Sequence, residues 1–174
     1  VHAVRDKAGD SEKITINLGY VDLGQQEGAS VALGGNRLTS DRGRYYSPTV
    51  LAGVPKTARV AREEIFGPVL SVVRFADLAE AVEITNATGY GLSAGVWSRD
   101  IDTALGYARA TKAGTVWINC YMDGFPEISF GGYGASGIGR ELGRTAIDEY
   151  IEHKSTIIRT GAQAPSWAGG VGEK

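Results

Sequence analysis

The chain has 174 residues, 43% of them hydrophobic, with a net charge of −2 at pH 7, one cysteine and two histidines. This charge supplies no basic surface for nucleic acid or anionic lipid, and no apolar run approaches the roughly 20 residues of a membrane-spanning helix. A single cysteine excludes an intramolecular disulfide framework, and His2 and His153 are too far apart in sequence to suggest a metal site, so we expect no metal and a cytoplasmic location.

Composition divides the chain into three parts. Residues 1–10 form a mixed, polar and ill-defined N-terminal segment, and residues 161–174 form a Gly-rich tail that is predicted to pack loosely. Residues 11–160 between them are predicted to form one domain. Because the sequence begins with Val1 rather than Met, we expect it to be processed or to start partway along a longer chain.

Strand and helix patterns alternate in the second half of the chain. The almost continuous apolar run Val69–Phe75 predicts a strand that is covered on both faces. Asp77 and Glu80 resemble a capping pair, which predicts a helix to about Thr88, and residues 94–97 read as a short strand.

The alternation continues toward the C-terminus. Asp100 is expected to cap a helix that ends at Gly114, before a buried strand over 115–118. Apolar spacing then predicts a helix over 139–154 and a final strand over 155–159. Strands that alternate with helices indicate the α/β class, with parallel strands and right-handed crossovers.

The segment Gly91–Gly95 fits the G-x-S-x-G pattern of a serine nucleophile at Ser93. A helix is predicted before Ser93 and a strand after it, which is the reverse of the strand-turn-helix context that this nucleophile needs. His153, the only downstream imidazole, is predicted to be a solvated residue near a helix end. A serine hydrolase remains an alternative.

The segment Gly132–Gly137 fits the G-x-G-x-x-G dinucleotide pattern. Only a few residues separate it from Pro126, which is too short for a convincing first strand. We interpret it as a Gly-rich loop that allows close backbone approach.

Cys120 directly follows the apolar strand pattern at 115–118. No histidine and no cluster of basic residues lies nearby in sequence to activate its thiol. Because free cysteine is among the most often buried residue types, we interpret Cys120 as a structural or loop thiol rather than a nucleophile.

Two acids and an aromatic ring, Glu63, Glu64 and Phe66, come just before the first predicted strand, next to a Gly-Pro turn. An ionised carboxylate accepts two hydrogen bonds from vicinal ribose hydroxyls, and a ring offers an apolar wall, so this edge suits a ribose. The alternative is that both glutamates are solvated and Phe66 belongs to the core.

Four segments in the same order resemble the NAD(P)-dependent aldehyde dehydrogenase family. Arg62–Val69 is similar to the glutamate-phenylalanine motif of that family, and segments 86–92, 114–119 and 130–143 are similar to its later landmarks. The likeness covers about residues 11–160. It implies the carboxy-terminal part of the catalytic domain, an α/β three-layer subdomain with a parallel sheet, lacking the Rossmann cofactor domain.

The resemblance implies a cofactor-binding edge. Glu64 corresponds to the acid that binds the ribose next to the nicotinamide of NAD or NADP, and Phe66 to the ring packed beside it. Gly134 stands where the family commonly has Lys, and this change creates the middle glycine of the dinucleotide-like pattern.

The resemblance also implies part of a catalytic pocket for a small-molecule aldehyde. Asn119, Phe125 and Phe130 would lie around it, with the two phenylalanines as walls of the aldehyde channel. Glu141 resembles an acid close to the water path of the catalytic thiol. Cys120 does not match the family's nucleophile.

The family oxidises an aldehyde to a carboxylic acid through a cysteine thiohemiacetal and thioester, so a chain without the matching cysteine is expected to be inactive alone. Two other interpretations remain open. The chain is a non-catalytic interaction protein, since 155–159 resembles the oligomerisation strand of a homo-oligomer, or it is one chain of a split dehydrogenase. Neither the aldehyde nor the choice between NAD and NADP follows from the sequence.

Overall fold

The computed structural model describes residues 4–5, 10–38 and 45–161. Of the ill-defined segment 1–10 only residues 4, 5 and 10 are described, and of the Gly-rich tail 161–174 only Gly161. The boundaries assigned to both therefore stay predictions.

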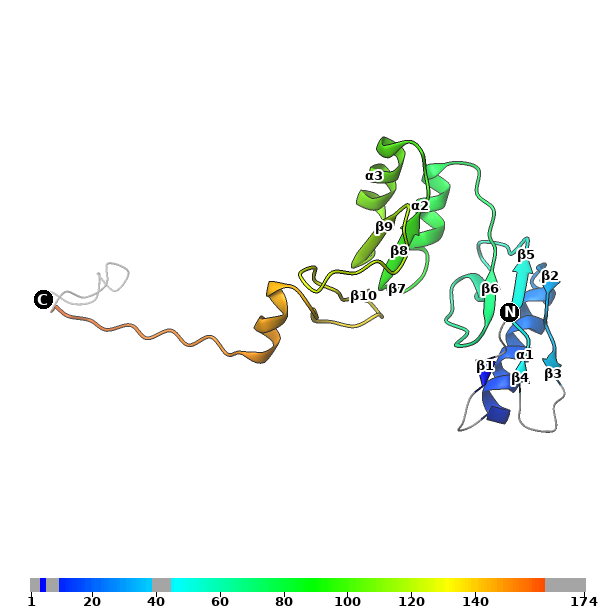
Figure 1. Cartoon of the computed structure of the whole chain (residues 1–174), viewed down its shortest axis with the longest axis horizontal. Helices are drawn as coiled ribbons and strands as arrows, with labels where there is room; N and C mark the ends of the chain where they lie inside the picture. The colour runs from blue at the N-terminus through cyan, green and yellow to red at the C-terminus, as the bar shows by residue number, and fades with distance from the viewer. Residues whose placement is uncertain (1–3, 6–9, 39–44, 162–174) are drawn as a thin grey trace, which may run out of the picture.

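The first body packs one long helix against a small mixed sheet (Figure 1). Helix α1 spans Asp10–Gln26, and strands β2, β5 and β6 span Ser30–Leu33, Thr49–Ala52 and Val69–Ser71. Strand β2 pairs antiparallel with β5, and β5 pairs in parallel with β6. A second antiparallel sheet has the order β1-β4-β3, whose strands span Val4–Arg5, Tyr45–Tyr46 and Arg37–Leu38.

One cluster of buried apolar side chains holds this body together. Leu51 of β5 is fully buried, and Val21 of α1 is 2% exposed. The 3-10 helix η1, Arg59–Ala61, packs on α1, and Ile65 beyond it enters the same cluster. Burial of this side chain anchors the loop that leads from η1 to β6.

The second body is a β-α-β unit with an additional helix. It comprises α2, β8, α3 and β9, which span Leu78–Asn86, Ser93–Val96, Ile101–Ala110 and Thr115–Ile118. Strands β8 and β9 pair in parallel and α3 connects them, since parallel strands need a crossover. Helix α3 packs on both strands and on α2, and the Tyr107 hydroxyl lies 2.9 Å from Thr85 Oγ1 of α2.

The start of α2 confirms the predicted capping pair. The Asp77 carboxylate accepts a hydrogen bond of 2.9 Å from the Glu80 backbone N–H, and the Glu80 carboxylate accepts one of 2.8 Å from the Ala76 N–H. Each side chain satisfies a backbone donor that the helix itself leaves free.

The Gly-rich loop is confirmed as a place of close backbone approach. Strand β10, Tyr133–Gly134, pairs antiparallel with β7, Tyr90–Gly91. A Cβ on Gly114 would collide with the carbonyl oxygen of Gly131. The glycine at this position therefore lets the segment before β9 lie directly against the Gly-rich loop. Gly114 does not end α3, because that helix already ends at Ala110, so the predicted helix end is wrong.

The helix predicted over 139–154 is also wrong in extent, because only the 3-10 helix η2, Arg144–Tyr150, forms there. Glu141 makes an isolated antiparallel bridge with Phe130, and the backbone of Leu142 has a left-handed φ of 59°. Both features are incompatible with a continuous α-helix.

Two strand predictions need correction. The segment 155–159 is extended and exposed but pairs with no described strand, so it is not a strand within this chain. Strand β6 ends at Ser71, and Leu70 and Phe75 are 60% and 61% exposed, so the run is not covered on both faces. Within the described residues, 155–159 lacks a partner strand, and the run from Val69 lacks a layer that covers its second face.

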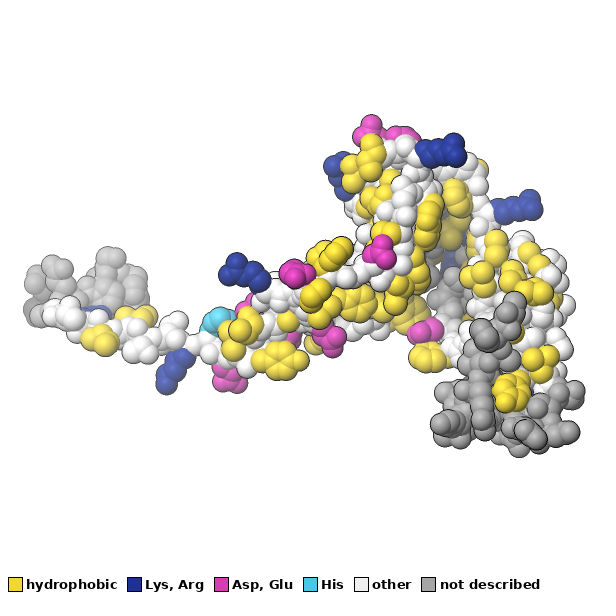
Figure 2. All heavy atoms as spheres, viewed as in Figure 1, with side chains coloured by type: hydrophobic (Ala, Val, Ile, Leu, Met, Phe, Trp, Pro, Cys, Tyr) yellow, Lys and Arg dark blue, Asp and Glu magenta, His cyan; other side chains and the backbone are white. Residues whose placement is uncertain are grey.

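The α/β class is confirmed, since in each body a helix packs on a sheet that contains a parallel strand pair. Large apolar side chains remain exposed over the second body and along the segment toward the C-terminus (Figure 2). Within the described residues, no helix combines the length and apolar character needed to cross a membrane.

The capping pair gives a direct stability test. Asp77→Ala removes the acceptor for the Glu80 N–H and should lower the free energy of unfolding by about 1 kcal/mol. Urea unfolding of the 174-residue chain, followed by far-UV circular dichroism, measures this loss. Asp148→Ala, in exposed η2, should leave the midpoint unchanged, and an unchanged midpoint for Asp77→Ala would contradict the cap.

Candidate functional site

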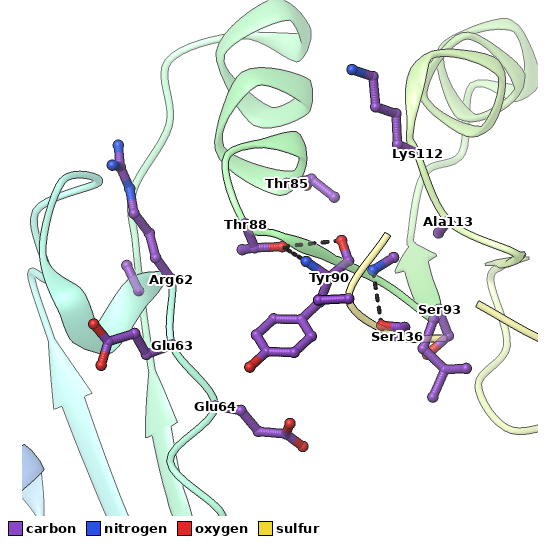
Figure 3. A pocket seen from close by; sticks show the side chains of 14 residues that line it. Arg62, Glu63, Glu64, Thr85, Thr88, Tyr90, Ser93, Lys112, Ala113 and Ser136 are labelled. Carbon is purple, nitrogen blue, oxygen red and sulfur yellow. Dashed lines mark hydrogen bonds between the residues drawn. The ribbon is translucent and has the colours of Figure 1, made fainter. Parts of the chain in front are cut away.

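A cleft of about 510 Å³ opens where the two bodies meet (Figure 3). One wall is residues 61–64, which run from the last residue of η1 to the residue before Ile65. The other wall is formed by the end of α2, by residues 88 and 90–93 around strand β7, and by side chains from later in the chain, among them Lys112, Ala113 and Ser136. Residues far apart in sequence thus share one opening.

The two neighbouring acids of the first wall have different environments. The Glu63 carboxylate accepts hydrogen bonds of 2.7 and 2.9 Å from the Arg59 guanidinium and one of 2.8 Å from the Tyr20 hydroxyl. These contacts, Arg59 first, lower the pKa of Glu63 below its ordinary value. The hydrogen bond to Glu63 also raises the pKa of the Tyr20 hydroxyl above its ordinary value. The Glu63 carboxylate is therefore already hydrogen-bonded to side chains of the protein, and a ligand would have to compete with them.

Glu64 points into the cleft and makes no hydrogen bond or ion pair with another described residue (Figure 3). Two residues further on, Phe66 has a φ of +53° and is 76% exposed. Phe66 is not a core residue, so the structure does not support that alternative. The loop presents an available carboxylate and an open ring on the same edge.

The opposite wall is held by one local and one long-range hydrogen bond to the backbone of β7. Thr88 Oγ1 accepts a hydrogen bond of 3.3 Å from the Tyr90 N–H, and Ser136 Oγ accepts one of 3.0 Å from the Gly91 N–H. Tyr90 projects its ring toward the opposite wall (Figure 3). Tyr90 was not among the site residues predicted from the sequence, although it lies within the family-like segment 86–92.

Phe130 and Glu141 come together at a neighbouring cleft of about 350 Å³. The Phe130 N–H donates to the Glu141 carbonyl at 2.7 Å, and the Glu141 N–H donates back at 2.8 Å. Leu92 and Ser136 line both this cleft and the first one. The second pair of predicted site residues therefore lies next to the cleft of Glu64.

Asn119 and Phe125 lie elsewhere. The Asn119 carboxamide accepts from the Ser98 N–H and donates to the Ser98 carbonyl, each at 2.9 Å, and so it joins the ends of β8 and β9. Phe125 is 61% exposed in the loop between β9 and β10. The structure brings neither to the other predicted residues, and their pocket roles stay predictions.

The remaining candidates occupy non-catalytic positions. Cys120 is half-buried in the loop after β9. Ser93 begins β8, with the short strand β7 between it and α2, so a strand rather than a helix follows Ser93 and the context of a serine nucleophile is missing. His153 is exposed in the extended segment and not at the end of an α-helix. Among the residues described, no group of three or more His, Cys, Asp or Glu side chains is placed to hold a metal ion.

Comparison with known proteins agrees with the sequence resemblance. The profile of the aldehyde dehydrogenase family matches residues 10–156. An aldehyde dehydrogenase of Alternaria alternata is 43% identical over 144 residues, which are 83% of this chain and 29% of the relative. The chain spans about 30% of the length of the curated relatives it matches.

Solved structures agree as well. An NAD-dependent aldehyde dehydrogenase from Sinorhizobium meliloti has a TM-score of 0.82 and 47% identity, over 92% of this chain and 31% of that one. A mutant indole-3-acetaldehyde dehydrogenase of P. syringae, in complex with NAD+ and IAA, has a TM-score of 0.80 and 42% identity, over 84% of this chain and 30% of that one.

The contacts of Glu63 predict a pH dependence of stability. A carboxyl whose pKa is lowered by folding stabilises the protein above the unfolded pKa of about 4.3, and this contribution is lost as pH falls through the folded pKa. Glu63→Gln should therefore lower the urea midpoint at neutral pH, and its difference from the parent should vanish in acid.

Urea titrations of both proteins across this range measure the effect. Because the Glu63 side chain is 38% exposed, high salt should also reduce the difference at neutral pH. Glu152→Gln, in the exposed extended segment, is the control. A Glu63→Gln difference that stays constant at every pH would contradict the assigned ion pair.

Proposed function

This chain belongs to the aldehyde dehydrogenase family, and from that premise we propose that it forms a cofactor-contacting edge and part of the aldehyde pocket of an NAD(P)-dependent dehydrogenase. The whole protein would oxidise an aldehyde to a carboxylic acid. Because the chain spans about 30% of its relatives, this activity is proposed for a longer polypeptide or an assembled enzyme. Residues 11–160 would be the catalytic subdomain.

The observation that carries the proposal is the difference between two adjacent acids. Glu63 is saturated by Arg59 and Tyr20, whereas Glu64 faces the cleft with both carboxylate oxygens available to a ligand. An ionised carboxylate has acceptor sites for two hydroxyl donors and fits a vicinal ribose diol. The donor set thus fits NAD or NADP, and the NAD-bound relative supports this choice.

Within this edge, each residue would have a defined role. Glu64 would orient the ribose next to the nicotinamide, and the exposed Phe66 ring would lie beside it and keep water from that side. When bound, the nicotinamide supplies the hydride acceptor. The chain's contribution is therefore orientation.

Phe130 and Glu141 would supply one wall of the aldehyde pocket, with Phe125 and Asn119 completing it in the assembled enzyme. The mutual backbone hydrogen bonds of Phe130 and Glu141 keep ring and carboxylate on one rigid bridge. Glu141 would accept a proton from water on its way to the thioester. Cys120 would play no part, and the attacking thiolate would come from outside these residues.

One observation favours a second role for the C-terminal segment. Residues 155–159 are extended and exposed, with backbone groups that pair with no described strand. An unpaired extended segment can add to the sheet of another subunit. We propose a homo-oligomer through this segment, either within the complete enzyme or as the function of an interaction fragment. One chain of a split dehydrogenase is the remaining alternative.

The 174-residue chain alone should show no reduction of NAD or NADP with any aldehyde. Activity should appear in a chimera in which residues 11–160 replace the matching part of the Sinorhizobium meliloti enzyme, 47% identical in sequence. Absorbance of the reduced nicotinamide measures both reactions. Robust turnover by the isolated chain, or a folded chimera without activity, would contradict the proposal.

In this chimera, Glu64→Gln should lower kcat/KM for NAD by about ten- to a hundredfold, because the neutral amide keeps one acceptor oxygen and puts a donor in place of the other. Steady-state kinetics with NAD and with NADP measure the change, while the KM for the aldehyde should stay similar. Glu152→Gln removes a carboxylate outside both clefts and serves as the control. Equal kinetics in the Glu64→Gln variant and its parent would contradict the proposal that Glu64 binds the ribose.

A further inference from the structure

Helix α1 contains a buried amide that the proposed site does not use. Asn17 is 5% exposed, and its Oδ1 has no hydrogen-bond partner among the described residues. A buried polar atom without a partner destabilises the folded state. The carboxamide instead makes a close contact with the backbone of another segment.

That contact is with the backbone of Gly67. A Cβ on Gly67 would lie 2.5 Å from Asn17 Cγ, and closer still to both terminal atoms of the carboxamide. The hydrogen that Gly67 carries in place of a side chain thus points at the carboxamide, in a weak Cα–H···O contact. Gly67 has no left-handed φ, so glycine is required here for space.

The two neighbours of Phe66 are the fixed points of its loop. On one side, Ile65 is 8% exposed in the core cluster, and on the other, Gly67 lies against Asn17. Between them Phe66 has a φ of +53°, which an aromatic residue adopts rarely and keeps only where its surroundings hold it. The direction of the exposed ring depends on both fixed points.

We propose that Asn17 is a positioning residue for the cofactor edge. Its carboxamide fixes the backbone at Gly67 and thereby sets the direction of the Phe66 ring and the Glu64 carboxylate. The inference rests on the function proposed for those two residues, and Asn17 itself touches no cofactor. Its side chain acts from α1, far from the loop in sequence.

A pair of substitutions tests the contact in the chimeric enzyme. Gly67→Ala places a methyl group into the Asn17 carboxamide and should displace the loop, lowering kcat/KM for NAD by about ten- to a hundredfold with an unchanged KM for the aldehyde. Asn17→Ala makes room for that methyl group, so the double variant should recover most of the lost kcat/KM. A double variant as impaired as the two losses combined would overturn the proposal.

A spectroscopic measurement on the 174-residue chain gives a readout apart from activity. Fluorophenylalanine can replace the four phenylalanines, and Phe66→Leu identifies the fluorine resonance of Phe66. Gly67→Ala and Asn17→Ala should each shift that resonance, the double variant should move it back, and Phe125 should not move. An unchanged Phe66 resonance in both single variants would refute the positioning role.

The two readouts separate this proposal from the function on which it rests. A shifted Phe66 resonance together with impaired use of NAD supports both. A shifted resonance with unchanged NAD kinetics supports the positioning role of Asn17 and contradicts the cofactor role proposed for Glu64 and Phe66.

Discussion

Burial of Ile65 in the core of the first body fixes the loop on which the proposed cofactor edge stands. Parallel pairing of β6 with β5 holds the far end of that loop, and η1 holds its near end against α1. With the backbone fixed at these points, alternate side chains face opposite ways, so Ile65 enters the core while Glu64 and Phe66 face solvent. The same constraint places Glu63 beside Arg59, four positions earlier in the chain, and the two side chains form an ion pair. Two chemically identical acids thereby acquire different roles.

The described residues leave more surface open to solvent than one compact domain would (Figure 1). Part of this excess comes from the separation of the two bodies and from the extended segment 151–161 (Figure 1). Part comes from large apolar side chains such as Trp97, which is 64% exposed. Surfaces of this kind are typical of protein that packs against further protein. They support the proposal that these residues work as part of a larger enzyme.

Predictions from the sequence were correct for structure that depends on neighbouring residues. The capping pair of α2 and the cap of α3 by Asp100 follow from contacts between residues a few positions apart. The strands predicted at 94–97 and 115–118 form at 93–96 and 115–118, because their apolar, β-branched composition favours a strand before any pairing is known. Predictions failed where distant contacts decide. The apolar spacing over 139–154 favours a helix, but the bridge between Glu141 and Phe130 competes with it and leaves only η2. Helix α1 was not predicted because its burial depends on strands that follow it in sequence.

The sequence by itself determined the family and the α/β class, because ordered motifs and short-range caps need no knowledge of packing, and it supplied the residues of the proposed cofactor edge. The sequence could not decide which of Glu63 and Glu64 is available to a ligand and which is hydrogen-bonded to the protein, since the two acids differ only in the side chains that the fold brings to them. Tertiary structure made that choice through Tyr20 and Arg59. It also joined Phe130 to Glu141 beside the cleft of Glu64, left Asn119 bound to Ser98, and set Asn17 against Gly67. Each of these contacts except the Glu63–Arg59 pair links residues that are distant in the chain, and long-range contacts are fixed by packing rather than by sequence spacing.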